Sequence, residues 1–248
     1  MAVLVTRPQP DDGATADSLR ARGFEVLKAP MLRFEPLPFH DEGEAQYGAV
    51  VVTSANALRG IESQLKGSRL LELPLFAVGE HTASAARGAG FSTVIPANGD
   101  AGSLRDLVLA SVKAKALKKA SPLLYLAGAD LARDLAGELG ERGFTVVTHT
   151  TYRMAAVPGL PRETSDAFAA NQVEAVLHYS RRSARAFLEA ARTAGVEISA
   201  LSIPQCCISE GVASVVRDAG ATQVMVAASP DEKALFAALD RALRPGSR

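Results

Sequence analysis

Short runs of apolar residues alternate along the chain with longer stretches in which apolar residues recur every three or four positions. The short runs predict buried strands, and the longer stretches predict amphipathic helices. Strands are expected at residues 3–6, 25–29, 49–53, 75–78, 93–95, 123–126, 145–151, 175–179, 205–208 and 223–227. Helices are expected at residues 11–22, 55–65, 81–87, 103–117, 131–142, 183–194, 212–219 and 231–243. Strands that alternate with helices predict an α/β fold, in which helices cover both faces of parallel sheets.

Two segments that contain prolines interrupt this alternation. Pro30, Pro36 and Pro38 exclude a helix from the first segment, because proline lacks the amide donor and its ring clashes with the preceding turn. Pro158 and Pro161 mark the second break. We expect the first segment to be extended.

The second half of the chain repeats parts of the first half. Residues 22–24 recur at 142–144, residues 49–54 resemble 175–180, and residues 89–94 resemble 219–224, with offsets of 120, 126 and 130. Matches in one order with slowly growing offsets indicate two copies of one unit. The alternative is that α/β units resemble one another by chance.

Two such lobes are expected to meet around a cleft, with ligands at the carboxyl ends of their strands. The turns after the predicted strands carry Ser, Thr or Gly where helices begin, as at residues 53–56, 79–82, 179–182 and 209–211. Each of these residues, taken singly, is explained as a helix cap. The same positions can also present amide groups to an anion. Their number in both copies favours a ligand with several negative groups.

Composition narrows the function further. Lys and Arg number 27, Asp and Glu number 27, and the formal net charge is zero. This balance argues against nucleic-acid or membrane-surface binding by bulk charge. The absence of Trp and an aromatic content of 5% argue against a platform for stacking bases. No apolar stretch approaches the length of a membrane-spanning helix. Taken together, these features predict neither a nucleic-acid nor a membrane partner. The chain is expected to be a monomer.

The two cysteines, Cys206 and Cys207, are adjacent in a predicted buried strand. Neighbours on a strand point to opposite faces, so these two are poorly placed to form a disulfide and are expected in the core. A reducing compartment follows, and the N-terminal residues lack the pattern of a signal peptide. The cytoplasm is the expected location.

Searches for common catalytic motifs find none. The sequence has no GxxxxGK[ST], no GxGxxG after a strand and no GxSxG, and its histidines show no metal-ligand spacing.

Several short motifs occur in an order that matches a known family. They lie at residues 4–8, 51–57, 77–83, 102–104, 124–128, 152–153 and 184–188. On these motifs the chain resembles the uroporphyrinogen-III synthase family over nearly its whole length. The resemblance implies two similar lobes, each a parallel five-stranded sheet flanked by helices. The lobes are interleaved: residues 1–36 plus 156–248 form the first, residues 37–155 form the second, and two crossing strands join them.

The resemblance also implies an activity. The family cyclises hydroxymethylbilane, a linear tetrapyrrole rich in carboxylates, to uroporphyrinogen III with inversion of ring D and loss of water. This is a hydro-lyase step of haem biosynthesis. No metal or organic cofactor is implied. A two-lobed sensor or binding module for a small anionic ligand is the alternative, and a synthase-like module with a regulatory role is a third possibility.

The expected site residues follow from the same motifs. Thr6, Arg7, Ser54, Asn56, Gly79 and Ser180 are expected to bind substrate, and the turn at Ser209 adds that residue. Thr82 is the first choice for a contact to the leaving group or a carboxylate. Tyr152 and Tyr179 are candidate general acids, although each is also explained as an amphipathic tyrosine at a strand end. The second copy departs from the family pattern at Ala127 and at residues 179–182 and 209–211.

Overall fold

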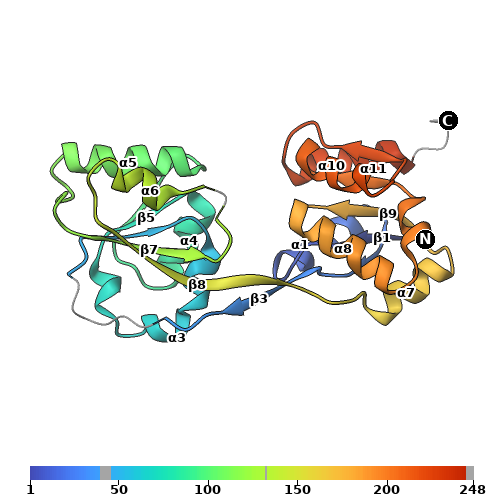
Figure 1. Ribbon diagram of the computed structural model, residues 1–248, viewed down its shortest axis with the longest axis horizontal. Coiled ribbons are helices and arrows are strands. Elements are labelled where there is room, and N and C mark those ends of the chain that lie inside the picture. The colour runs from blue at the N-terminus through green and yellow to red at the C-terminus, as the bar shows by residue number, and fades with distance from the viewer. Residues whose placement is uncertain (40–45, 132, 244–248) are drawn as a thin grey trace. The chain divides into compact units, whose positions relative to one another are not determined.

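The computed structural model describes residues 1–39, 46–131 and 133–243. Its contacts divide the chain into two compact units (Figure 1). Unit 1 comprises Met1–Phe34 and Ala155–Arg248, and unit 2 comprises Glu35–Met154. The chain passes from one unit to the other twice, within strands β3 (Leu32–Pro36) and β8 (Val146–Ala156).

Unit 1 contains a parallel sheet of five strands in the order β11-β10-β9-β1-β2. The strands are β1 (Ala2–Val5), β2 (Glu25–Lys28), β9 (Val173–His178), β10 (Gln205–Cys207) and β11 (Val224–Val226). One face is covered by α1 (Asp11–Arg20) and α11 (Glu232–Leu243). The other face is covered by α7 (Arg162–Ala169), α8 (Arg181–Thr193) and α10 (Glu210–Asp218), and α9 (Glu197–Leu201) packs beside α8.

The core of unit 1 follows the two-residue period of its strands. Val3 and Val5 pack on the side of α1 and α11, whereas Leu4 between them packs on the side of α8. The same alternation separates Cys206 from Cys207, which are both fully buried and free. Burial raises the pKa of each thiol to about 12. The prediction that both cysteines belong to the core is confirmed.

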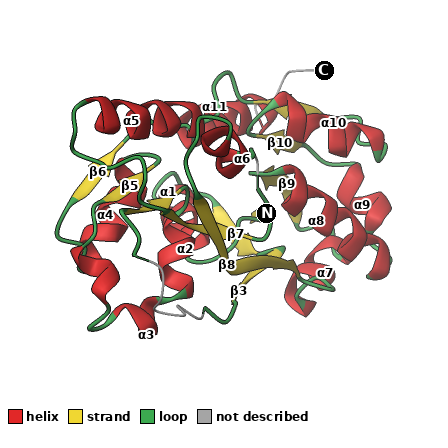
Figure 2. Ribbon diagram, turned by 60° about the vertical axis from the view of Figure 1, so that its left-hand side comes forward, coloured by secondary structure: helices red, strands yellow, loops and turns green. Residues whose placement is uncertain are grey.

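Unit 2 contains a sheet of six strands in the order β3-β8-β7-β4-β5-β6. Its remaining strands, β4 (Ala49–Val52), β5 (Leu75–Ala77), β6 (Val94–Pro96) and β7 (Leu123–Gly128), are parallel to one another and to β8. One face packs against α2 (Ala55–Gly60), α3 (Glu62–Leu65), the 3₁₀ turn η1 (Arg69–Glu72) and α4 (Glu80–Gly88). The other face packs against α5 (Ala101–Lys113) and α6 (Leu135–Gly140). Figure 2 shows both yellow sheets flanked by red helices.

The predicted fold class is confirmed, and the structure adds detail. All the predicted strands are present, and the first proline segment contains β3, which makes a sixth strand at the edge of the sheet in unit 2. Helices α7 and α9 were not predicted. They are short, and a proline-rich break precedes α7.

One predicted helix is divided in two, and another begins later than expected. The segment 55–65, predicted as one helix, forms two helices, α2 and α3, because the backbone leaves helical geometry at Ile61. The helix predicted at residues 131–142 begins only at Leu135. The Asp134 carboxylate caps its start by accepting a hydrogen bond from the Gly137 amide at 2.9 Å. Residue 132 lies outside the described residues.

The two sheets have the same spatial order when chain order is set aside. Strands β2-β1-β9-β10-β11 of unit 1 correspond to β8-β7-β4-β5-β6 of unit 2. Gly90 and Gly220, which are 130 positions apart, end equivalent helices with the same φ of 101°. Equivalent ion pairs join Arg87 to Glu80 and Arg217 to Glu210. These shared details support the duplication predicted from the sequence.

None of the helices within the described ranges has both the length and the apolar character needed to cross a membrane.

Candidate functional site

The strand order of unit 1 places a switch point between β1 and β9. From β1 the chain crosses through α1 to β2 on one side, and from β9 it crosses through α8 to β10 on the other. Connections that leave in opposite directions open a crevice at the carboxyl ends of the two strands. Thr6 follows β1 and Tyr179 follows β9, so both residues lie at this edge.

A cluster of polar side chains occupies the edge of unit 1. One carboxylate oxygen, Glu232 Oε1, accepts hydrogen bonds from Thr15 Oγ1 at 2.5 Å, Tyr179 OH at 3.0 Å and Arg7 Nη1 at 3.2 Å. Arg7 Nη2 also binds Asp11 Oδ2 at 3.1 Å. We call these five residues the Glu232 cluster.

The charges of the Glu232 cluster do not balance. Arg7 contributes one positive charge, while Asp11 and Glu232 contribute two negative charges, so the sum is −1. Burial, and next the charge of Glu232, raise the pKa of the Tyr179 hydroxyl well above its usual range. Tyr179 therefore stays protonated, with its proton directed at Glu232.

The other predicted residues of unit 1 have different surroundings. Thr6 is fully buried, and its hydroxyl donates to the Leu177 carbonyl at 2.8 Å, so within this unit its side chain is closed to a ligand. Ser180 caps α8, with its hydroxyl accepting the Ser183 amide at 3.1 Å. Ser209 stands at the start of α10 but makes no side-chain capping bond. Its hydroxyl is therefore left for other partners.

Unit 2 has its own switch point, between β4 and β7. Here β4 leads through α2 and α3 to β5 on one side, and β7 leads through α6 to β8 on the other. Ser54 follows β4 and caps α2, accepting the Asn56 amide at 3.2 Å. The neighbouring hydroxyls of Thr53 and Tyr125 lie 3.0 Å apart. This edge presents neutral hydroxyls and the first turn of a helix.

Tyr152 belongs to β8 and lies beside the end of β7. Its ring tip rests on Gly128: a Cβ at that glycine would lie 2.7 Å from Tyr152 Cζ and 2.8 Å from its hydroxyl oxygen. Only a residue without a side chain leaves room for the ring there. Gly128 therefore brings Tyr152 to the same edge as Ser54.

Gly79 and Thr82 stand at the start of α4, after β5. Gly79 is the cap residue, and its Cα faces the backbone of Gly99, because an added Cβ would lie 3.3 Å from the Gly99 Cα. Thr82 is buried in the first turn of α4. Gly79 thus has a packing role as well as its predicted place in the site.

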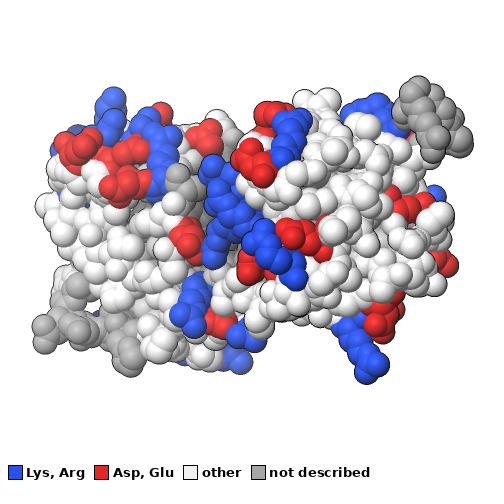
Figure 3. Space-filling model, turned by 45° about the vertical axis from the view of Figure 1, so that its right-hand side comes forward, with Lys and Arg blue, Asp and Glu red and all other residues white. Residues whose placement is uncertain are grey.

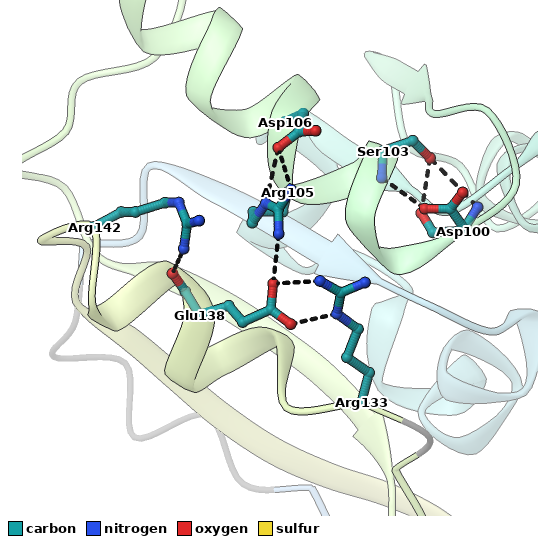
Figure 4. Close-up of polar contacts among 7 residues, drawn as sticks. All are labelled: Asp100, Ser103, Arg105, Asp106, Arg133, Glu138 and Arg142. Carbon is teal, nitrogen blue, oxygen red and sulfur yellow. Dashed lines mark hydrogen bonds and ion pairs between the residues drawn. The ribbon is translucent and has the colours of Figure 1, made fainter.

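Besides the Glu232 cluster of unit 1, the structure has a charged cluster in unit 2, which was missed by sequence reasoning (Figure 4). Glu138 on α6 pairs with Arg133 through both carboxylate oxygens and with Arg105 on α5 at 2.9 Å. The hydrogen bonds of Arg133, and then of Arg105, hold the pKa of the Glu138 carboxyl at about 2. Asp106 pairs with the other side of Arg105. Because each guanidinium has a carboxylate partner, this cluster joins α5 to α6.

Sequence reasoning also missed a buried polar pair in unit 1. His178 Nε2 lies 2.9 Å from Gln205 Oε1, and both side chains are fully buried. Burial lowers the pKa of His178 to about 4, so the ring is neutral at physiological pH. The described ranges contain no group of three His, Cys, Asp or Glu side chains placed to hold a metal ion.

Comparison with known proteins assigns the chain to a family. A model of the family described as uroporphyrinogen-III synthase HemD matches residues 13–237. The chain belongs to the uroporphyrinogen-III synthase family. Members of this family are cyclising lyases of tetrapyrrole biosynthesis.

Solved structures of uroporphyrinogen-III synthases share the fold. The synthetase from Helicobacter pylori has a TM-score of 0.67 at 18% identity, over 98% of this chain and 99% of that one. A mutant synthase from the extremely thermophilic bacterium Thermus thermophilus has a TM-score of 0.57 at 17% identity, over 98% and 99%. No curated protein sequence matches the chain.

The predicted site residues of this family member fall into two groups. Unit 1 brings Thr6, Arg7, Tyr179, Ser180 and Ser209 to the carboxyl-end edge of its sheet. Unit 2 brings Ser54, Asn56, Gly79, Thr82 and Tyr152 to the corresponding edge. Each group is therefore contributed by a single unit.

Proposed function

We propose that this chain closes hydroxymethylbilane to uroporphyrinogen III, with the carboxyl-end edges of both sheets binding the substrate. Membership of the family supports the reaction. The observation that carries the proposal is that each unit places hydroxyls and helix starts at its own switch point.

The helix starts suit the substrate's carboxylates. The first amides of a helix lack partners within it and carry a partial positive charge. α8 and α10 begin at the edge of unit 1, and α2 and α4 begin at the edge of unit 2. Ser54, Asn56, Gly79, Ser180 and Ser209 are the proposed contacts at these helix starts. Arg7, held by two carboxylates, is a weaker carboxylate site than its charge suggests.

The chemical step needs an acid and a controlled geometry. Loss of the substrate hydroxyl as water requires a proton, and we assign its delivery to Tyr152. Tyr179 is the poorer acid, because burial and Glu232 raise its pKa. Thr82 is the proposed contact to the leaving hydroxyl or to a carboxylate.

Ring inversion is a problem of positioning. The free substrate closes without inversion, so the enzyme must favour attack by the substituted carbon of the last ring. Holding both reacting ends in the correct geometry is sufficient to change which bond forms first. The proposal therefore needs no group other than the binding residues and the acid.

The chain's charge distribution supports a small-molecule substrate. Figure 3 shows acidic side chains beside many of the basic ones over the face drawn, in keeping with the formal net charge of zero. We propose a cytoplasmic monomer without a nucleic-acid or membrane partner. Light scattering of the purified chain measures the oligomeric state directly.

Product analysis tests the function. Purified protein is incubated with freshly made hydroxymethylbilane, the product is oxidised, and the porphyrin isomers are separated. Type III isomer is expected, with heat-denatured protein as the control. Formation of type I isomer alone, at the spontaneous rate, would overturn the proposal in favour of a binding module without catalysis.

A further inference from the structure

The feature that carries a further inference is the convergence of three donors on one oxygen in the Glu232 cluster. Thr15, Tyr179 and Arg7 come from α1, from the turn after β9 and from the turn after β1, and all bind Glu232 Oε1. Arg7 also stacks over the Tyr179 ring, with its Cζ 4.8 Å from the ring centroid. The Tyr179 hydroxyl is thus fixed in position and in the direction of its proton.

We propose that Glu232 holds Tyr179 as a hydrogen-bond acceptor for a pyrrole N–H of the substrate. A phenol has one proton to donate and an oxygen that accepts. Tyr179 is half-buried, and because its proton is given to Glu232, its hydroxyl oxygen offers only acceptor capacity to a ligand. Hydroxymethylbilane carries one N–H donor on each pyrrole ring. This inference rests on the proposed function and assigns part of the substrate to unit 1.

The charge of the cluster agrees with this assignment. Its sum of −1 disfavours a substrate carboxylate and favours a polarised N–H group. Glu232 acts here through Tyr179 and Arg7, so it is a positioning residue.

The need to cap the start of α11 does not explain why a glutamate stands at position 232. Asp231 already caps that helix, with its Oδ1 accepting the Ala234 amide at 2.8 Å. In unit 2, Asp100 caps the equivalent helix α5 in the same way, accepting the Ser103 amide at 2.7 Å. The residue after Asp100 is Ala101, so an equivalent helix is held without a glutamate at this position.

The first experiment reads the direction of the Tyr179 proton without substrate. The intensity ratio of the tyrosine Raman doublet differs between a phenol that donates and one that accepts. The chain has four tyrosines and no Trp, and subtracting the spectrum of Tyr179→Phe isolates Tyr179. A strong-donor ratio is expected in the wild type and is expected to disappear in Glu232→Leu. An unchanged ratio in Glu232→Leu would overturn the inference.

The second experiment tests whether the substrate binds to the Tyr179 hydroxyl oxygen. Glu232→Leu frees the Tyr179 proton, so KM for hydroxymethylbilane is expected to rise roughly 10-fold while kcat changes less. The matched control is Glu197→Leu, since Glu197 also stands in the first turn of a helix and pairs with Arg192, with a side chain 30% exposed against 33% for Glu232. In a Tyr179→Phe background, Glu232→Leu is expected to have little further effect.

The outcomes separate the two proposals. If Glu232→Leu has the kinetics of the Glu197 control while both variants remain folded by circular dichroism, the acceptor role is wrong although the function stands. If the wild type yields only type I isomer, the function is wrong and the pyrrole assignment falls with it, whatever the Raman ratio.

Discussion

Unit 1 and unit 2 share a sheet order, equivalent glycine turns and equivalent ion pairs, but their carboxyl-end edges carry different chemistry. The edge of unit 1 holds a charged cluster in which Glu232 gathers three donors. Beside β4 and β7 the edge of unit 2 holds neutral hydroxyls and a tyrosine placed by Gly128, and Arg133, in the loop after β7, is paired with Glu138. The two units have therefore kept the same sheet order and turns after duplication, while the residues at their switch points have diverged.

The divergence suits a substrate whose two ends are treated differently. Two identical edges would make the same contacts with a given ligand group, whereas these two edges make different ones. Equivalent positions differ in polarity: Thr82 of unit 2 corresponds to Val212 of unit 1, and Val52 corresponds to His178. Exchanging residues between equivalent positions tests whether these differences matter.

The largest expected effect concerns the buried pair His178 and Gln205, whose equivalents in unit 2 are Val52 and Leu75. The folded pKa of His178 is about 4, against an ordinary value of 6.5, so only the unfolded chain gains a proton between these values. The free energy of unfolding should have its full value above pH 6.5 and should fall by about 3 kcal/mol as the pH drops to about 4.

The double variant His178→Val/Gln205→Leu should lose less stability over the same range. Urea unfolding at several pH values measures the effect, and His81→Gln, an exposed histidine, is the control. An acid-side slope identical to that of the wild type would contradict this prediction.

The next effect concerns the two tyrosines. Tyr152→Phe should lower kcat roughly 100-fold, because the proposed general acid is lost. Tyr179→Phe should lower kcat less, because that hydroxyl donates to Glu232 and its raised pKa makes it a weak acid. Steady-state kinetics with hydroxymethylbilane separate the two, and the reverse order would exchange the assigned roles.

A smaller effect is expected on stability at Gly60. A Cβ there would overlap the carbonyl oxygen of Thr151, whose hydroxyl donates to the Ala57 carbonyl at 3.0 Å. Gly60→Ala should cost about 2 kcal/mol of unfolding free energy. The equivalent residue of unit 1 is Ala186, and Ala186→Gly should cost less than about 1 kcal/mol. Equal losses in urea unfolding would show that the close approach is not specific to unit 2.

The smallest effect is expected at Thr82. Thr82→Val keeps the shape of the side chain and installs the valine found at Val212, so stability should change little. Loss of the hydroxyl should lower kcat/KM about 10-fold. Val212→Thr is the matched control and should leave turnover as it is. Wild-type kinetics in Thr82→Val would remove Thr82 from the site.

The sequence was sufficient for most of the elements and for the duplication. Hydrophobic periodicity located every strand of the two sheets except β3, and the internal matches located equivalent turns such as those at Gly90 and Gly220. The pairing of β1 with β9 did not follow from local pattern, because the partners are far apart in the chain. The interleaved layout was instead expected from the family resemblance.

The site was predictable only in part. The motifs placed Arg7 and Tyr179 correctly after their strands, but their common partner Glu232 lies on the last helix, with no local signal linking it to them. The pair of Arg105 with Glu138 was missed for the same reason, since ion pairs between helices depend on tertiary packing. The direction of the Tyr179 proton, which changes its proposed role, follows only from the structure.

The discontinuity of unit 1 has a consequence for synthesis on the ribosome. Val3 pairs with Ala175, which is 172 positions later in the chain. At ordinary translation rates the first strand waits on the order of 10–30 s for this partner, whereas the continuous unit 2 emerges in full before it. Because β2 follows soon after and pairs with the other edge of β1, the nascent chain must protect only one unpaired edge of this apolar strand, and the four-residue length of β1 keeps that edge short.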